Sequence, residues 1–356
     1  MISKKSLLNF FKFLLFLSIG LVILYLVYRS QNAAFQADCA IKGIPSEECS
    51  LLDKVWADFR SVQPFWILMV FLAYAVSNVS RAIRWNMLLG AMGYRPKFVN
   101  AFLTIIVGYF ANLGLPRMGE IVRAGTMARY ERIPLEKVIG TVVVDRIVDV
   151  ISILALTALA FVLDFNTIWT FADEHVNLNK RFGGKGTLLL VMAIVGVAGL
   201  GLFWVLRKRL LQIPIFQKVV QIASGFAEGI KTIRQLDRPW VFVLHSINIW
   251  LMFFLMSYFC FLAFAPTAGL PMVAALTVFV FGAWGMVVPS PGGMGTYHFL
   301  AQLALGFYDI SGEDGFSFAN ISFFTVQLGC NILWGILSLL LLPNINRNYQ
   351  PAVSTL

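Results

Sequence analysis

Residues 138–163 read VIGTVVVDRIVDVISILALTALAFVL, an apolar run that carries three charged side chains, Asp145, Arg146 and Asp149. A helix rises about 1.5 Å per residue and needs about 20 apolar residues to cross roughly 30 Å of hydrocarbon, so this run is long enough to span a bilayer. An ionisable side chain at that depth costs several kcal/mol. The three charges must therefore be compensated by partners or retained for a function.

Comparable apolar runs recur along the whole chain. They cover residues 7–28, 64–83, 186–206, 240–263 and 318–342. The composition is 59% hydrophobic and 13% charged, about half the charged fraction of a soluble domain. Lipid offers no partner for backbone amides, and the runs are longer than barrel strands, so they must be helices. We predict an all-α polytopic transmembrane helical bundle with six full spans, forming one integral membrane domain over residues 1–356.

Charge distribution predicts the orientation of this bundle. Most Lys and Arg residues fall on alternate connecting segments, which places both termini in the cytoplasm of a multi-pass protein of the cell (inner) membrane. Residues 29–63 become an external segment, and Cys39 and Cys49 within it could form a disulfide if that side is oxidising. Residues 207–238 form a basic amphipathic segment for the inner leaflet, or else a plain cytoplasmic loop.

Two further apolar stretches, 98–116 and 272–291, end in proline and glycine clusters, LPRMG at 115–119 and PSPGGMG at 289–295. Such clusters at membrane depth indicate broken or re-entrant helices buried in protein. We define residues 98–137 and 272–310 as the first and second broken repeats. Five residues recur at a constant spacing: Leu103, Thr104, Val107, Pro116 and Gly119 fall on Leu276, Thr277, Val280, Pro289 and Gly292. This favours an inverted repeat around a transported species, with chance similarity as the alternative.

Arg81 and Arg84 lie at the end of the second span, spaced so that they share a helix face. They could clamp a phosphate, with Trp85 as an interfacial anchor. Arginines that only fix the helix end at the membrane surface are an equal alternative.

Arg117, Glu120 and Arg123 follow the first broken stretch. A helix that starts there would aim free N–H groups at the cavity and favour an anion. Arg123 lies one turn after Glu120, so we expect the two to pair when the site is empty and Arg123 to turn to a phosphate when it is filled. A purely structural ion pair is the alternative.

Asp145 and Asp149 are separated by one helical turn, a repulsive arrangement unless a cation lies between them or one is protonated. Arg146, Arg123 or Arg84 could supply that cation. The competing interpretation is a buried network that only locks helices together.

The second glycine cluster contributes Pro289, Gly292, Gly293 and, just beyond it, His298. A lone histidine is usually a hydrogen-bonded helix residue, so His298 is a weak candidate. The sequence contains no catalytic motif and no metal-ligand pattern, and it predicts no cofactor. No nucleic-acid motif accompanies the net charge of +10, which the membrane explains better.

Four motifs in order carry a resemblance to a known family: RAIRW at 81–85, PRMGE at 116–120, DRIVD at 145–149 and PSPGGMG at 289–295. Over residues 62–342 the chain resembles the lysylphosphatidylglycerol synthase transmembrane family. The resemblance implies a flippase-like membrane module without the soluble aminoacyl-transferase domain. Two positions depart from the family pattern: Asp145 stands where members usually have Glu, and His298 replaces a carboxylate.

These observations predict a flippase that moves an anionic-headgroup or polyprenyl-phosphate-linked lipid between leaflets. A membrane-embedded transferase acting on a lipid-linked substrate and a small-solute secondary transporter are the alternatives. The expected partner is the membrane lipid itself, and the sequence is compatible with a homo-oligomer.

Overall fold

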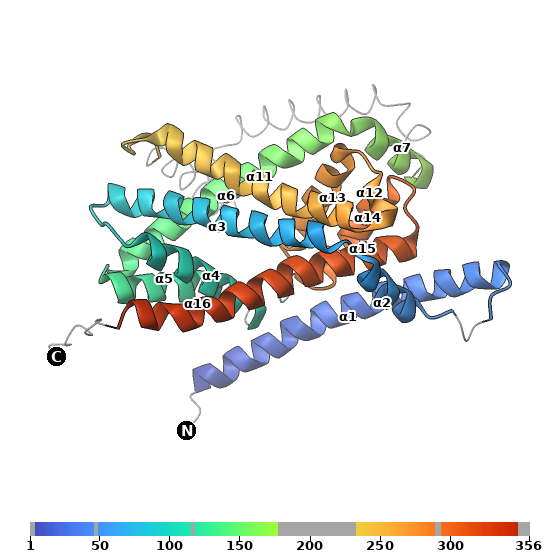
Figure 1. The fold of residues 1–356 in the computed structure, drawn as a ribbon, viewed down its shortest axis with the longest axis horizontal. Coiled ribbons are helices and arrows are strands. Elements are labelled where there is room, and N and C mark those ends of the chain that lie inside the picture. The colour runs from blue at the N-terminus through green and yellow to red at the C-terminus, as the bar shows by residue number, and fades with distance from the viewer. Residues whose placement is uncertain (1–3, 46–48, 115–117, 177–232, 289–292, 348–356) are drawn as a thin grey trace, which may run out of the picture.

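The computed structural model describes residues 4–45, 49–114, 118–176, 233–288 and 293–347. Every regular element within these ranges is a helix (Figure 1). The elements are α1 (Lys4–Ile41), α2 (Leu51–Ser61), α3 (Pro64–Ala91), α4 (Phe98–Gly114), α5 (Gly119–Glu131), α6 (Leu135–Leu163), α7 (Phe165–Val176), α11 (Pro239–Ala263), α12 (Ala265–Ala268), α13 (Met272–Gly285), α14 (Thr296–Gly306), α15 (Gly312–Phe323), the π-helix η3 (Phe324–Cys330) and α16 (Asn331–Ile345).

Long apolar helices form the body of the molecule and run along its longest axis (Figure 1). Among the described residues four helical stretches are long and apolar enough to cross a membrane: α3, α6, α11 and the continuous run from Gly312 to Ile345. α1 covers the predicted run 7–28. The prediction of a polytopic helical membrane protein is thus confirmed. The predicted run 186–206 and most of the segment 207–238 lie outside the described residues.

Helix α6 buries charged side chains and exposes apolar ones, which is the opposite of a helix on the surface of a soluble protein. The side chain of Asp145 is completely buried, whereas Val162 is 75% exposed. The same helix also exposes Val143 and Leu154, and α11 exposes Leu244. Water would penalise this arrangement, but hydrocarbon favours it because it solvates apolar side chains and excludes charges.

The two predicted broken repeats are helical hairpins. α4 ends at Gly114 and packs against α5, which begins at Gly119. α13 ends at Gly285 and packs against α14, which begins at Thr296. The hairpins lie at opposite ends of the long helices (Figure 1). Thr104 of α4 and Thr277 of α13, matched in the sequence comparison, are both fully buried. The predicted broken helices are therefore present, and they enter the bundle from opposite ends.

Glycines allow the two arms of each hairpin to approach closely. In the first hairpin the N–H of Gly119 donates to Asn112 Oδ1 at 2.7 Å, and Gly119 lies against the backbone of Gly108. In the second hairpin Gly285 lies against the backbone of Thr296, whose hydroxyl donates to the Gly285 carbonyl at 2.6 Å. Side-chain-free positions at these points let each hairpin fold tightly.

The segment 29–63 is mostly helical, comprising the end of α1 and all of α2. A disulfide joins Cys39 to Cys49 across the turn between them. Lys54 of α2 pairs with Asp58 at 2.8 Å and with Asp314 of α15 at 2.6 Å. The Lys54–Asp314 ion pair joins α2 to α15, at the same end of the bundle as the second hairpin (Figure 1).

We predict that Gly119→Ala destabilises the first hairpin. A Cβ there would overlap the Gly108 carbonyl oxygen and lie 2.6 Å from Asn112 Nδ2, and overpacking of this kind costs about 1–3 kcal/mol. The measurement is the thermal midpoint of purified protein in detergent. Gly125→Ala on the same helix is the matched control, because its Cβ would meet no atom within 4 Å. Equal midpoints for the two variants would contradict the close approach.

Candidate functional site

Two arginines of α3 bridge two aspartates of α6. Arg81 Nη1 lies 3.3 Å from Asp145 Oδ2 and 2.8 Å from Asp149 Oδ2. Arg84 Nη2 lies 2.5 Å from Asp145 Oδ1 and 2.8 Å from Asp149 Oδ1, and its Nη1 also donates to Ser246 of α11. Guanidinium groups thus lie between the carboxylates, as the helical spacing required. Arg84 was among the cations expected between Asp145 and Asp149, whereas Arg81 was not expected there.

Arg123 of α5 approaches the same aspartates from the first hairpin. Its Nη2 donates to Asp145 Oδ2 at 2.9 Å, and its guanidinium lies over the Trp85 ring at 4.2 Å. Trp85 is buried and donates its indole N–H to Thr141 at 2.9 Å. The expectation that Trp85 anchors at the membrane interface was wrong. Its ring instead supports the Arg123 side chain by a cation–π contact.

The expected pairing of Glu120 with Arg123 was also wrong. Glu120 accepts a hydrogen bond from Arg146 of α6, and Arg146 Nη1 lies 3.6 Å from Asp149 Oδ2. Residues one turn apart on a helix can pair, but a partner on a packed neighbouring helix offers better geometry for each side chain here. Because α5 packs on α6, both Glu120 and Arg123 reach across to that helix.

The network carries a surplus of positive charge. Its members are the guanidinium groups of Arg81, Arg84, Arg123 and Arg146 and the carboxylates of Asp145, Asp149 and Glu120. Counting only described residues, the four cations and three anions give this network a net charge of +1. Arg81, Arg84 and Arg123 are buried, whereas the Arg146 side chain is 43% exposed, so Arg146 is the most accessible of these four arginines.

A cavity of about 470 Å³ lies beside the network. Arg81, Arg146, Glu120 and Asp149 form its charged end. The rest of its lining comes from α3, α4, α6, α11, α13, α14 and the run from α15 to α16, and it includes Leu113 of the first hairpin and Val288 and Gly293 of the second. The two broken helices and the ion network therefore border one common space.

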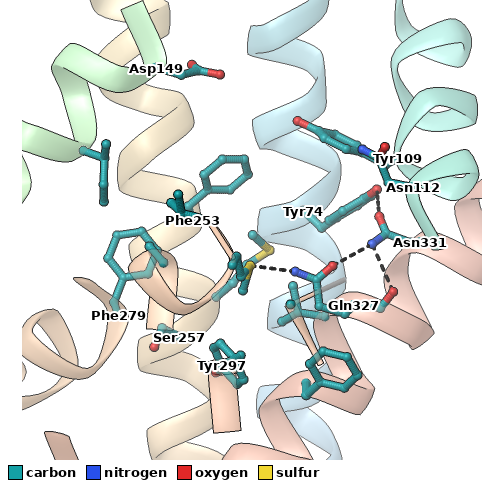
Figure 2. Close-up of a pocket in the computed structure, with 18 of the residues that line it drawn as sticks. Tyr74, Tyr109, Asn112, Asp149, Phe253, Ser257, Phe279, Tyr297, Gln327 and Asn331 are labelled. Carbon is teal, nitrogen blue, oxygen red and sulfur yellow. Dashed lines mark hydrogen bonds between the residues drawn. The ribbon is translucent and has the colours of Figure 1, made fainter. Parts of the chain in front are cut away.

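The cavity has an aromatic wall and a neutral polar wall (Figure 2). Phe253 and Phe279 lie on one side, and Tyr74, Asn331 and Gln327 lie on the other. Sequence reasoning selected the charged residues of this cavity but not its neutral polar residues, among them Tyr74, Tyr109, Asn112, Gln327 and Asn331. Two of them could have been selected from the sequence, because Gln327 and Asn331 are amide side chains one helical turn apart inside the apolar run 318–342.

The remaining candidates lie apart from the network. His298 is buried on α14, where its Nδ1 accepts the N–H of Gly295 at 3.4 Å, and it does not line the cavity. Gly293 lines the cavity in a left-handed backbone conformation, with φ of 80°. Arg117, Pro289 and Gly292 lie outside the described residues. Within the described ranges no three His, Cys, Asp or Glu side chains gather as a metal site would need.

Comparison with known proteins identifies the family. Residues 50–333 match the family described as the lysylphosphatidylglycerol synthase TM region. The chain belongs to this family. The matched range contains α3 to α15 and therefore the ion network, both hairpins and nearly all of the cavity lining. No solved structure matches the chain.

Curated relatives of this lysylphosphatidylglycerol synthase TM family member are membrane proteins. The chain is similar to the UPF0104 membrane protein MJ1595 of Methanocaldococcus jannaschii, with 26% identity over 58% of this chain and 67% of that protein. It is also similar to the UPF0104 membrane protein PH1989 of Pyrococcus horikoshii, with 32% identity over 27% of this chain and 30% of that protein. The matches support an integral, multi-pass membrane protein.

We predict that Asp145→Asn strongly destabilises the bundle. Replacing this carboxylate by a neutral amide leaves the buried Arg84 and Arg123 without their shared anionic partner, and breaking a buried ion pair typically costs about 3–5 kcal/mol. The measurement is thermal unfolding in detergent, with Glu136→Gln at the exposed start of α6 as the control.

A second substitution separates charge from packing. Asp145→Asn combined with Arg123→Met removes one charge of each sign, so the double variant should be more stable than the sum of the two single effects predicts. Simple additivity would mean that Arg123 and Asp145 do not interact.

Proposed function

We propose that this protein moves a lipid with an anionic headgroup between the two leaflets. The observation that carries the proposal is the surplus guanidinium charge at the edge of a large, mainly apolar cavity. A surplus charge at membrane depth is costly, and a ligand that brings the opposite charge removes that cost. A phosphate supplies it and matches the planar guanidinium fork.

Arg146 is the residue that receives the headgroup. It is the most exposed guanidinium of the network, and in the empty site it is held by Glu120 and Asp149. A phosphate can take the place of Glu120, while Arg81, Arg84 and Arg123 keep the two aspartates neutralised. Binding then exchanges one carboxylate partner for another anion, and the buried part of the network stays paired.

The rest of the cavity suits the lipid body. Phe253, Phe279 and Trp250 offer apolar surface beside the charged end. The two hairpins border the cavity from opposite ends of the bundle. Movement of one hairpin or the other against the long helices would therefore open the headgroup site toward a different leaflet, which is the arrangement that alternating access needs.

The alternative of a membrane-embedded transferase needs a free base, and the aspartates are poor candidates. The carboxylate of Asp145 accepts hydrogen bonds from Arg81, Arg84 and Arg123, and that of Asp149 accepts from Arg81 and Arg84. Oxygens engaged in this way have few lone pairs left to accept a substrate proton.

We predict that Arg146→Gln slows transport of an anionic lipid at least about tenfold, because a charge-assisted hydrogen bond is worth about 1.5–3 kcal/mol. The assay follows fluorescent phosphatidylglycerol in proteoliposomes, with external dithionite quenching the outer leaflet. Arg347→Gln, at an exposed position just after the end of α16, is the matched control. Equal transport of phosphatidylglycerol and zwitterionic phosphatidylcholine by the unaltered protein would overturn the proposal, as would an unaffected Arg146→Gln variant.

We also propose that the end of the bundle bearing α2 faces the oxidising side of the cell (inner) membrane, with both termini in the cytoplasm. The Cys39–Cys49 disulfide supports this, because disulfides persist in oxidising compartments. α1 begins and α16 ends at the opposite end of the bundle (Figure 1).

Thiol labelling tests the orientation. In a Cys260→Ala, Cys330→Ala background, Cys39 and Cys49 of acid-quenched membranes should resist alkylation until a reductant is added. Cys39→Ser should leave Cys49 reactive without reduction. Two thiols that react without reductant would place this end in a reducing compartment.

A further inference from the structure

A groove of about 460 Å³, which we call the α5–α16 groove, lies apart from the cavity beside the ion network. Its walls include Ile121, Gly125 and Arg129 of α5 and Leu339, Leu342 and Pro343 of α16. α4 packs against both helices, whereas α5 and α16 barely touch each other, and Val107 of α4 lies on the floor between them. The groove and the cavity share no lining residue. They are therefore separate sites.

The sequence of α5 serves both sites because the helix has two faces. Arg123 is buried and belongs to the ion network. Ile121, Gly125 and Arg129 recur at intervals of four residues, so they form a strip along another side of the helix, where they line the groove. Ile121 is 60% exposed, and Leu339 on the opposite wall is 45% exposed. The groove therefore opens toward the bilayer.

The interior of the groove suits a hydrocarbon chain. Val107 and Leu339 offer apolar surface. Gly125 keeps the space open, because a Cβ added there would meet no atom within 4 Å. The Thr126 hydroxyl donates to the Val122 carbonyl of its own helix at 2.7 Å, so this donor is already satisfied. An acyl chain can lie here without desolvating an unsatisfied donor.

Two polar groups of the lining suit a phospholipid headgroup. Arg129 is exposed, and its guanidinium carbon lies 5.7 Å from the centre of the Tyr130 ring. Pro343 lies inside α16 and has no N–H, so the Leu339 carbonyl loses its usual helical donor. A phosphate complements the arginine, and a headgroup hydroxyl complements the carbonyl.

The charge around this end of the bundle favours an anion. The flanking segments 94–97, 129–137 and 346–347 contain six basic and two acidic residues. One of the two acids, Glu131, already accepts hydrogen bonds from the Lys97 backbone and the Asn100 side chain. Basic residues at a membrane surface attract lipids with anionic headgroups.

Hydrogen bonds at the same end hold the walls of the groove in place. Asn346, just after α16, donates to Asn100 Oδ1 of α4 at 2.8 Å, and Asn100 donates back to Asn346 Oδ1 at 3.0 Å. Asn100 also donates to Glu131 at the end of α5. The three helices are thus joined where they lie together at one end of the bundle (Figure 1). A ligand finds the groove already formed, which lowers the entropic cost of binding.

We propose that the α5–α16 groove binds one anionic phospholipid, with its acyl chain along Gly125 and Leu339 and its phosphate at Arg129. The inference goes beyond the proposed function, because this lipid stays bound and is not transported. The walls belong to the first hairpin and to α16, so the bound lipid stabilises the hairpin in the position seen here. A second copy of the chain would bring the same basic surplus to this end, and like charges oppose that contact.

The test is photolabelling in proteoliposomes. Two probes, phosphatidylglycerol and phosphatidylcholine, carry the same diazirine-bearing acyl chain, and the labelled residues are located by mass spectrometry of peptides. We expect labelling to concentrate on Ile121 and Leu339 rather than on Val162, which is a lipid-exposed residue of α6. Labelling in the groove should be about fivefold stronger with phosphatidylglycerol, as expected for one basic residue near the membrane surface.

Two pairs of variants locate the lipid. Gly125→Leu fills the groove and should abolish labelling of Leu339. Gly140→Leu is its control, because Gly140 is exposed on α6 and a Cβ there also meets no atom within 4 Å. Arg129→Gln should remove the preference for phosphatidylglycerol. Arg95→Gln is its control, because Arg95 is exposed at the same end but does not line the groove.

The labelling pattern decides the occupant of the groove. Even labelling of all lipid-exposed helices, unchanged by Gly125→Leu, would mean ordinary bilayer lipid and would overturn the site. Groove labelling without preference for phosphatidylglycerol would overturn the anionic headgroup. An unlabelled groove, with a dimer in native mass spectrometry that Gly125→Leu converts to a monomer, would assign the groove to a second copy of the chain instead.

Arg146→Gln separates this proposal from the proposed function. This variant should slow transport and leave groove labelling unchanged, because Arg146 does not line the groove. Loss of groove labelling in Arg146→Gln would overturn the independence of the two sites. Intact groove labelling in a protein that transports no anionic lipid would overturn the proposed function alone.

Discussion

The pairing of α6 carboxylates with arginines of α3 and α5 is the interaction on which the rest of the structure depends. Asp145 and Asp149 cannot enter hydrocarbon as charged groups unless cations accompany them. Arg81 and Arg84 each bond both aspartates, and Arg123 adds a third helix to the cluster. The network therefore fixes the relative positions of α3, α5 and α6. Van der Waals contact alone would fix them less specifically, because lipid competes with every apolar contact.

A second constraint follows from the broken helices. α4 and α13 end inside the bundle, so each hairpin leaves space beyond its tip that a full crossing would fill. The cavity occupies this space, with charged residues at one end and amides and phenols along one wall. Backbone that stops short of a full crossing is tolerated at membrane depth only where protein or a water-filled cavity surrounds it. The cavity thus follows from the ends of α4 at Gly114 and of α13 at Gly285.

Sequence reasoning found the fold and the charged cluster for one physical reason. A charge in an apolar run such as 138–163 is so costly that it requires a partner or a function. Asp145, Arg146 and Asp149 can therefore be selected from the sequence alone. It assigned Glu120 to Arg123 because only the spacing along one helix is visible in a sequence, whereas the observed partner, Arg146, comes from a neighbouring helix. Gln327 was overlooked because a neutral amide in a membrane helix is a much weaker signal, and its π-helical turn has no sequence signature.

The pairing also explains how a charged site can exist both with and without a ligand. If all four arginines faced the cavity, the empty protein would carry four uncompensated charges in a medium that does not tolerate one. Three of them are instead buried or engaged with aspartates, and only Arg146 is substantially exposed, with Glu120 as its exchangeable partner. Under the proposed function, a headgroup phosphate competes for Arg146 with this single carboxylate, and its release restores the Glu120–Arg146 pair.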